Sequence, residues 1–457
     1  MSLADYGKNL ERQRALEGRS MRMIRAAFLA MAGLWPATTV FAQSAHSPEP
    51  GNPPALTTLP QDKNRLIVPP PIATGPLPDQ PRMNLPGEAP LTELRQADDF
   101  WTSIDYLWWW TKPSDTSIPL ISTGPRTGLT TVLGNGVIGQ PGTSIAFPQK
   151  DITYGTFSGM RLNGGFWFDD AKTAGLETTF LLTENRTYGY NFDANEASSF
   201  FPTIPYTQPT GTATSLLNDQ LNSGPGALIP FSTNIVFMSQ HQMFGQDINY
   251  VANIGRTPSQ TLDLIAGFRW LQVNESSMLA MTSSSDVDGS TAVVNGVDAI
   301  ACNNNFFGGQ FGGRIREKFG RWNLETNVKI GLGSTRQSVH ISGYRSVNGP
   351  GDTSFTQPGF VFTQPSNIGL NVVNRFAVLP EVGAKVSYDL LDWCSVSLGY
   401  NFLYLSSVAR ANNQFDNETQ PNTGYSPTTY TGTRPAFLKE STDYWMQGVS
   451  AGLELRY

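Results

Sequence analysis

Basic side chains recur at every second position around residue 316, and this spacing is the sharpest chemical feature of the chain. Arg314, Arg316 and Lys318 would share one face of a β-strand, because alternate side chains of a strand point the same way. Such a row could form a ladder that attracts anions, or it could pair with acids such as Glu325 on a neighbouring strand. Pairing is the favoured interpretation, because acidic and basic residues are nearly balanced on the corresponding faces of other segments.

Acid–base or nucleophilic chemistry has little support in the sequence. Outside the leader segment the histidines are His46, His241 and His340, and no Asp or Glu lies at a local spacing that would orient His340. No catalytic residue is therefore predicted, although a Ser or Asp partner from elsewhere keeps a protease as an alternative. The sequence shows no metal-ligand cluster, phosphate loop or nucleophile elbow, so neither a metal nor a cofactor is expected.

The elements that would position the charges follow from the alternation of apolar and polar residues. Near the C-terminus, for example, Val396, Leu398 and Tyr400 alternate with small polar residues. This pattern predicts ten strands, at 99–110, 155–168, 174–188, 235–252, 260–274, 304–319, 322–336, 374–390, 394–409 and 442–457.

The connections between these segments alternate between short and long. Short links lie at 169–173, 255–259, 320–321 and 391–393, and the long ones are the ranges 111–154, 189–234, 275–303, 337–373 and 410–441. A soluble sandwich has no reason to sort its loops in this way. The sequence therefore predicts an all-β fold, a transmembrane antiparallel up-and-down barrel of about ten strands with short periplasmic turns and long external loops.

In such a barrel the polar face of each strand lines the interior, where charges face water or one another. The interior is then either a polar channel whose opposed charges set ion selectivity, or a closed space filled by salt bridges. The residues predicted to face it are Asp105, Arg161, Glu177, Asp263, Arg269, Arg314, Arg316, Lys318, Glu325, Lys329, Glu381, Lys385, Glu454 and Arg456.

Aromatic residues gather at the predicted strand ends, where amphipathic rings prefer the membrane–water interface. The alternative is that large rings fill strands anywhere. The residues predicted to form the two aromatic girdles are Trp101, Trp108, Trp110, Trp167, Phe168, Trp322, Tyr388, Trp393 and Tyr457.

The closing segment carries one apolar face and ends the chain on an aromatic ring. Val449, Leu453, Leu455 and Tyr457 lie on that face. The ending resembles the last strand of bacterial outer-membrane barrels, which the barrel assembly machinery reads. The expected partners are therefore this machinery and outer-membrane lipid.

The N-terminal region reads as an export leader and a spacer. A basic segment up to Arg25 precedes an apolar stretch that ends at Ala42, which is typical of a signal peptide over 1–42, and translation could start at Met21 or Met23. Residues 43–97 are rich in proline and predict a periplasmic tether, either a plain spacer or a contact with the cell envelope. The barrel would occupy 98–457.

The composition of the chain excludes one class of function. Charged residues make up 15% of the chain and the net charge is −6, so a nucleic-acid partner is not expected.

The two cysteines are not expected to form a disulfide. Cys302 and Cys394 are predicted at opposite ends of the barrel, too far apart for a disulfide, so both should be free thiols.

Three segments carry a family resemblance. The opening strand, Phe100 to Trp110, together with Gly159 to Trp167 and Leu264 to Trp270, resembles the beta-barrel-porin-7 family of bacterial outer-membrane proteins. The resemblance covers roughly residues 99–457 and implies an outer-membrane barrel in a Gram-negative-type envelope, with a transport role and no catalytic residues.

The sequence thus leaves two functions open. The first is a porin-like passive channel for small solutes or ions through a charged, narrow lumen. The second is a structural or adhesin-like barrel that acts through its long external loops.

Overall fold

The computed structural model describes residues 99–456, except 126–135, 149–150, 196, 217–229, 288–289, 350–353 and 424–426. The chain divides into a unit up to Gln96 and a unit from Ala97 to Tyr457, and only the second contains described residues. The predicted signal peptide, the predicted tether and Tyr457 lie outside the described residues. Within the described part no helix is both long and apolar enough to span a membrane.

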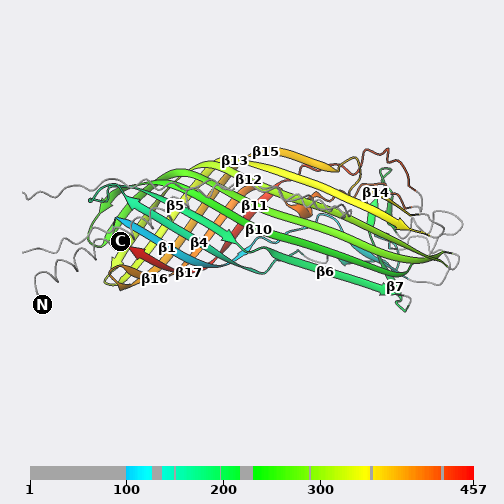
Figure 1. The fold of residues 1–457 in the computed structure, drawn as a ribbon, viewed down its shortest axis with the longest axis horizontal. Helices are drawn as coiled ribbons and strands as arrows, with labels where there is room; N and C mark the ends of the chain where they lie inside the picture. Colours follow the sequence, from blue (N-terminus) through cyan, green and yellow to red (C-terminus); the bar gives the residue numbers. More distant parts are fainter. Residues whose placement is uncertain are drawn as a thin grey trace, which may run out of the picture. The chain divides into compact units, whose positions relative to one another are not determined.

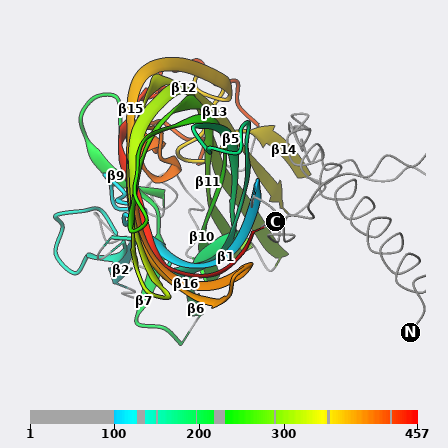
Figure 2. The ribbon, with the colours of Figure 1, turned by 90° about the vertical axis from the view of Figure 1, so that its left-hand side faces the viewer.

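Ten antiparallel strands form a closed ring, which confirms the predicted barrel (Figures 1 and 2). The ring closes between its first and last strands, where Trp101 lies opposite Arg456 and Thr111 opposite Met446. The strands of the ring are β1 (Phe100–Thr111), β4 (Thr156–Trp167), β5 (Ala174–Thr183), β10 (Pro230–Arg256), β11 (Gln260–Val287), β12 (Ser290–Phe319), β13 (Trp322–Asn348), β15 (Gly369–Leu391), β16 (Cys394–Val408) and β17 (Thr442–Arg456).

The outer face of the ring is apolar near the short turns. On β11, Leu262, Leu264 and Phe268 are 37–49% exposed, as expected for side chains that face lipid. This belt ends where the indole of Trp270 donates a hydrogen bond to Asn305 over 3.2 Å. From Gln260 to Trp270 is about the length of strand that spans a bilayer, roughly 9–11 residues.

Four strands continue far beyond this belt. β11 runs on from residue 271 to 287, which at roughly 3.3 Å per residue is a distance of roughly 55 Å along the strand. Figure 1 shows β10, β11, β12 and β13 extending well past the other strands of the ring. We call the part of these strands beyond the belt, together with β6 (Arg186–Asn195) and β14 (Ser354–Pro358), the projecting sheet.

The projecting sheet corrects several predicted boundaries. The range 275–303, predicted as a loop, is a hairpin in which Val287 pairs with Ser290, and β13 occupies the first part of the range 337–373. The predicted strand 174–188 is two strands, β5 and β6. The physical reason is that these segments lie outside lipid. Their outward positions mix polar residues such as Thr282 and Asn295 with apolar residues such as Met278 and Val297, so no regular apolar alternation marks the strands.

Parts of the other connections fold back onto the projecting sheet and form an apolar core there. β2 (Ile121–Pro125), β3 (Ser144–Phe147) and β7 (Phe200–Thr203) form a small separate sheet. From it the ring of Phe147 packs 4.7 Å from the rings of both Tyr190 and Phe237. The external connections are therefore packed against the strands in this region.

Asp298 fixes one of these connections to the projecting sheet. Its carboxylate accepts hydrogen bonds from the backbone N–H groups of Val361, Phe362 and Thr363 over 3.0–3.2 Å, and from the Thr363 hydroxyl over 2.6 Å. Burial raises the pKa of Asp298 to about 6, so this group, which lies beyond the lipid belt, is ionised at neutral pH. Hydrogen bonds to a charged acceptor are the stronger kind.

We predict that Asp298→Ala exposes the connection between β14 and β15 to proteolysis. Loss of about 1.4 kcal/mol of docking free energy raises the undocked population tenfold. Chymotrypsin should therefore cleave at Phe360 and Phe362 at least about ten times faster, as read by mass spectrometry. Asp193→Ala, at an exposed carboxylate of β6, is the matched control. Equal cleavage of both variants would contradict the role of Asp298.

Candidate functional site in the barrel interior

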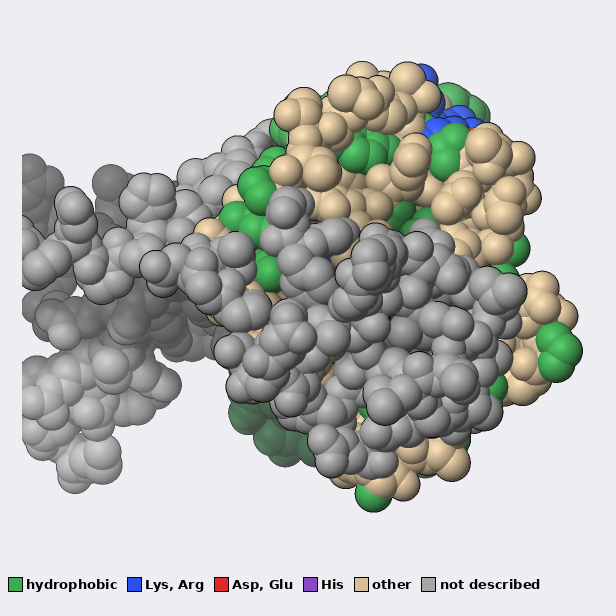
Figure 3. Space-filling model, turned by 90° about the vertical axis from the view of Figure 1, so that its right-hand side faces the viewer, with side chains coloured by type: hydrophobic (Ala, Val, Ile, Leu, Met, Phe, Trp, Pro, Cys, Tyr) green, Lys and Arg blue, Asp and Glu red, His purple; other side chains and the backbone are tan. Residues whose placement is uncertain are grey.

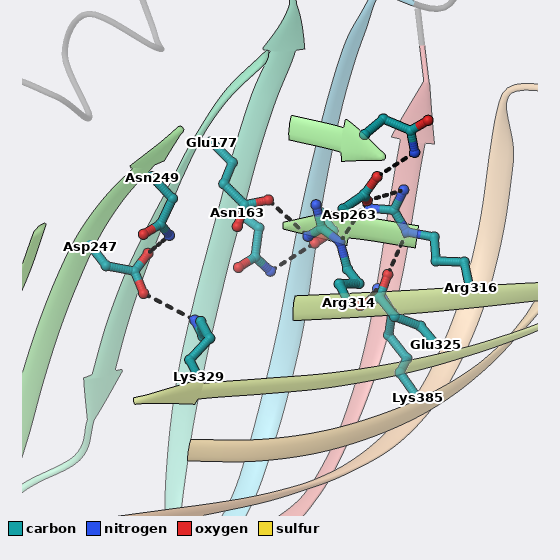
Figure 4. A network of polar contacts seen from close by, with 12 residues as sticks. Asn163, Glu177, Asp247, Asn249, Asp263, Arg314, Arg316, Glu325, Lys329 and Lys385 are labelled. Carbon is teal, nitrogen blue, oxygen red and sulfur yellow. Dashed lines mark hydrogen bonds and ion pairs between the residues drawn. The ribbon is translucent and has the colours of Figure 1, made fainter. Parts of the chain in front are cut away.

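The short-turn half of the barrel interior holds a network of buried ion pairs. Glu381 on β15 is one centre of it: its carboxylate contacts Arg269 directly and lies 3.7 Å from Lys329 Nζ and 3.9 Å from an Arg161 nitrogen. Lys329 also lies 3.2 Å from Asp247 (Figure 4). All five side chains are at least partly removed from water, so each charge depends on its partners.

Two members of the predicted basic row, Arg314 and Arg316, belong to a second centre. Arg314 lies 2.8 Å from Glu177 and 3.3 Å from Asp263, and Arg316 lies 3.5 Å from Asp263. Arg316 also pairs with Glu325 over 2.7 Å, the contact that the pairing interpretation named. Figure 4 shows these residues pointing toward one another across the strands.

A third group of pairs lies closer to the turns. Lys318 and Arg456 lie 3.2 Å and 3.3 Å from the two oxygens of Asp389, and Lys385 lies 3.3 Å from Glu454. All the residues predicted to line the interior thus enter ion pairs, apart from Asp105, whose carboxylate accepts a hydrogen bond from Asn163 over 3.2 Å.

Two acids of the network were missing from the predicted set. Asp247 lies on β10, where glutamines at 240, 242 and 246 obscure the alternation, so neither face could be assigned there. Asp389 shares the polar face of its strand with Glu381 and Lys385, and extending that alternation four residues beyond Lys385 would have included it.

A cavity of about 390 Å³, which we call the vestibule, lies at the turn end of the network. Trp101 and Trp167 line it, with their ring centroids 5.3 Å apart. Their prediction as girdle residues is wrong. Both lie an even number of residues from interior positions, Asp105 and Arg161, so their side chains point inward.

The remaining girdle predictions fall on the outer surface where the structure describes them. Trp108, Phe168, Trp322 and Trp393 are exposed, and Trp110 and Tyr388 contact outward rings. Val449, Leu453 and Leu455 of the predicted assembly signal also face outward, with Leu453 among the exposed apolar side chains. Recognition of this face by the assembly machinery stays a prediction.

Farther from the short turns than the charged network, the interior is filled by apolar side chains, which was not predicted from the sequence. Apolar side chains from nine of the ten wall strands meet there, each at most 3% exposed. We call this layer the septum; its members are Leu107, Trp109, Phe157, Leu181, Met243, Leu271, Val273, Phe306, Ala377, Leu379, Leu403, Leu405, Tyr444 and Met446.

Glycines on the same or a neighbouring strand make room for large side chains of the septum. A Cβ atom on Gly448 would lie 2.7 Å from the ring of Trp109, and one on Gly308 would lie 2.6 Å from the ring of Phe306. β13 supplies only Gly331 and Gly333 at this level, opposite Leu379 and Ala377. Large rings lying over glycines explain how a ten-stranded interior is filled by its own side chains.

A buried polar cluster lies beyond the septum and holds the connection between β16 and β17 inside the barrel. Arg410 pairs with Glu275, whose other oxygen accepts from Ser114 over 3.1 Å. Asn412, in the short 3₁₀-helix η1 (Ala411–Gln414), donates to Ser114 over 2.7 Å. Next to it, the ring of His241 lies 5.3–5.4 Å from the rings of Tyr154, Phe157 and Tyr444.

The remaining candidate residues are not brought into one site. His340 is exposed on β13, and within the described residues no group of three or more His, Cys, Asp or Glu is placed to hold a metal ion. Cys302 and Cys394 are both buried and free, as predicted.

A closed antiparallel ring with an apolar outer belt defines an outer-membrane β-barrel protein. Residues 101–457 match the family model "Putative beta barrel porin-7 (BBP7)", so the chain belongs to the beta barrel porin-7 family. No curated protein matches the chain.

Several solved structures are similar to the chain. The outer-membrane protease OmpT from Escherichia coli matches at 9% identity with a TM-score of 0.39, over 79% of this chain and 98% of OmpT. The Pseudomonas putida toluene transporter TodX matches at 9% identity and a TM-score of 0.20, over 79% and 90%. An anion-selective porin from Comamonas acidovorans matches at 8% identity and a TM-score of 0.13, over 78% and 98%.

We predict that Glu381→Gln destabilises the barrel strongly, because it leaves three buried cations short of a partner. Breaking a buried pair costs about 3–5 kcal/mol. The free energy of unfolding, measured with urea in micelles, should fall by that amount. Glu317→Gln is the matched control: its carboxylate accepts a hydrogen bond from Gln260 and makes no ion pair in the described part of the chain. A similar loss in both variants would contradict the importance of the network.

Proposed function

We propose that this protein is a closed outer-membrane barrel whose working surface is the projecting sheet and the connections packed on it. The barrel anchors that sheet in the bacterial outer membrane and displays it outside the cell. In this proposal residues 1–42 direct export, residues 43–97 lie in the periplasm as a tether, and the assembly machinery recognises the closing strand. No catalytic step is part of the proposal.

The observation that carries the proposal is the septum. A water-filled pore needs polar or at least wettable side chains along its whole length. Here a layer of buried apolar side chains from nine wall strands lies across the interior, and the cluster around Arg410 and Glu275 holds a further segment beyond it. Ion flow through this arrangement would require the septum to separate.

The size and packing of the external part support a role at the surface. β10 to β13 are 27–30 residues long, far more than a membrane crossing requires. The described part of the outer end carries mainly apolar and uncharged side chains, with one small basic area (Figure 3). Uncharged surfaces of this kind suit contact with another macromolecule better than attraction of ions.

A passive channel for small solutes or ions is the second candidate. The vestibule favours it, since a charged cavity at the turn end has the position and lining of the inner half of a narrow pore. The channel would then be gated, with the septum as its closed gate.

Single-channel recording in planar bilayers distinguishes these candidates. We predict that the intact barrel shows no resolved conductance steps at moderate voltage. Trp109→Ala combined with Phe306→Ala removes two large rings of the septum and should produce steps, because water can fill the space. Trp108→Ala combined with Phe307→Ala, at neighbouring outward-facing positions, is the control and should stay silent. Regular steps from the unaltered protein would overturn the closed-barrel proposal.

A further inference from the structure

The vestibule is large enough and accessible enough to be a binding site in its own right. Its volume of about 390 Å³ falls within the roughly 300–1,000 Å³ of small-molecule pockets. Its lining includes the turn from Arg256 to Gln260 and Lys172 in the turn after β4, so it opens at the turn end of the barrel. The septum lies at the opposite end of the charged network.

The lining of the vestibule carries more positive than negative side chains. Nine of its lining residues are Lys or Arg and six are Asp or Glu. Three further acids of the network, Asp247, Asp263 and Asp389, are in ion pairs with lining cations but do not line the cavity themselves. Cations therefore form the larger part of the charged surface that a solute in the vestibule would meet.

The ion pairs are also oriented with their cations toward the cavity. The side chain of Arg316 is 34% exposed while that of its partner Asp263 is 0% exposed, and Lys318 is 51% exposed while Asp389 is 11% exposed. Arg456 is likewise more exposed than either of its acidic partners. These cations are therefore more accessible to a solute in the vestibule than the carboxylates with which they pair.

Two cations at the mouth make no ion pair in the described part of the chain. The guanidinium of Arg256 lies 5.5 Å from the ring centroid of Trp167 and donates to the backbone carbonyl of Lys172 over 3.3 Å. Lys172 itself has a φ of +53°, a left-handed conformation held by the turn. Arg256 is thus positioned by an aromatic ring and a carbonyl rather than by a carboxylate. Its positive charge can therefore pair with a bound anion.

We propose that the vestibule binds a small soluble anion that carries phosphate or carboxylate groups. Lys172 and Arg256 contact it at the mouth, and the exposed ends of Arg316 and Lys318 contact it further in. Guanidinium groups match the geometry of such anions through paired hydrogen bonds. The site is reached from the turn side, so binding does not require the septum to open and does not depend on the proposed surface role.

Isothermal titration of the purified full-length protein in neutral detergent, with inorganic pyrophosphate as the probe at low ionic strength, tests the proposal. We expect saturable binding at one site per chain, weakened at least tenfold in the double variant K172Q/R256Q and weakened by added salt. Putrescine, a small dication, should not bind.

The double variant R336Q/K439Q is the matched control, because it removes the same charge at positions outside the vestibule. It should bind pyrophosphate as the unaltered protein does. A difference in gel mobility between unheated and heated protein verifies that each variant is folded. Absence of saturable binding, equal binding by K172Q/R256Q, or an equal loss in R336Q/K439Q would each overturn the assignment of the vestibule as an anion site.

Discussion

The interior of a closed ten-stranded ring has to be filled, and most other features of this protein follow from how that is done. Eight strands enclose a space that side chains just fill, so ten leave somewhat more. Near the turns the space is filled by long charged side chains that satisfy one another, centred on Glu381 and Asp263. Further out it is filled by large rings that lie over glycines, as Phe306 does over Gly308.

These two solutions place different demands on the sequence. Buried charges are tolerated only in complete sets, because a single unpaired charge is more costly than an apolar replacement. Apolar rings demand volume instead, which glycines on the same or a neighbouring strand provide. The change from one solution to the other within a single strand, for example from Arg269 to Leu271 on β11, divides the interior into a charged part and an apolar part.

The sequence was sufficient for the ring and for the turn-end half of the interior. Because outward residues in the lipid belt are apolar, the alternation predicts that residues such as Arg161 and Glu454 point inward. The lengths of the connections distinguish the two ends of the barrel. The septum was missed because its members alternate with outward residues that are also apolar, so Leu403 and Leu405 look like any strand residues. The projecting sheet was missed because its outer side lies outside lipid and mixes polar with apolar residues, so alternation against lipid no longer applies.

The continuity of β10 to β13 from the short turns to the tip of the projecting sheet has a mechanical consequence. A pull on the tip acts along the strands, so the inter-strand hydrogen bonds are loaded together in shear rather than one after another, as they are when a hairpin is peeled open. The load passes directly into the closed ring and its membrane seat. In the proposed surface role, a macromolecule bound at the tip would therefore load the closed ring directly, without a separate stalk.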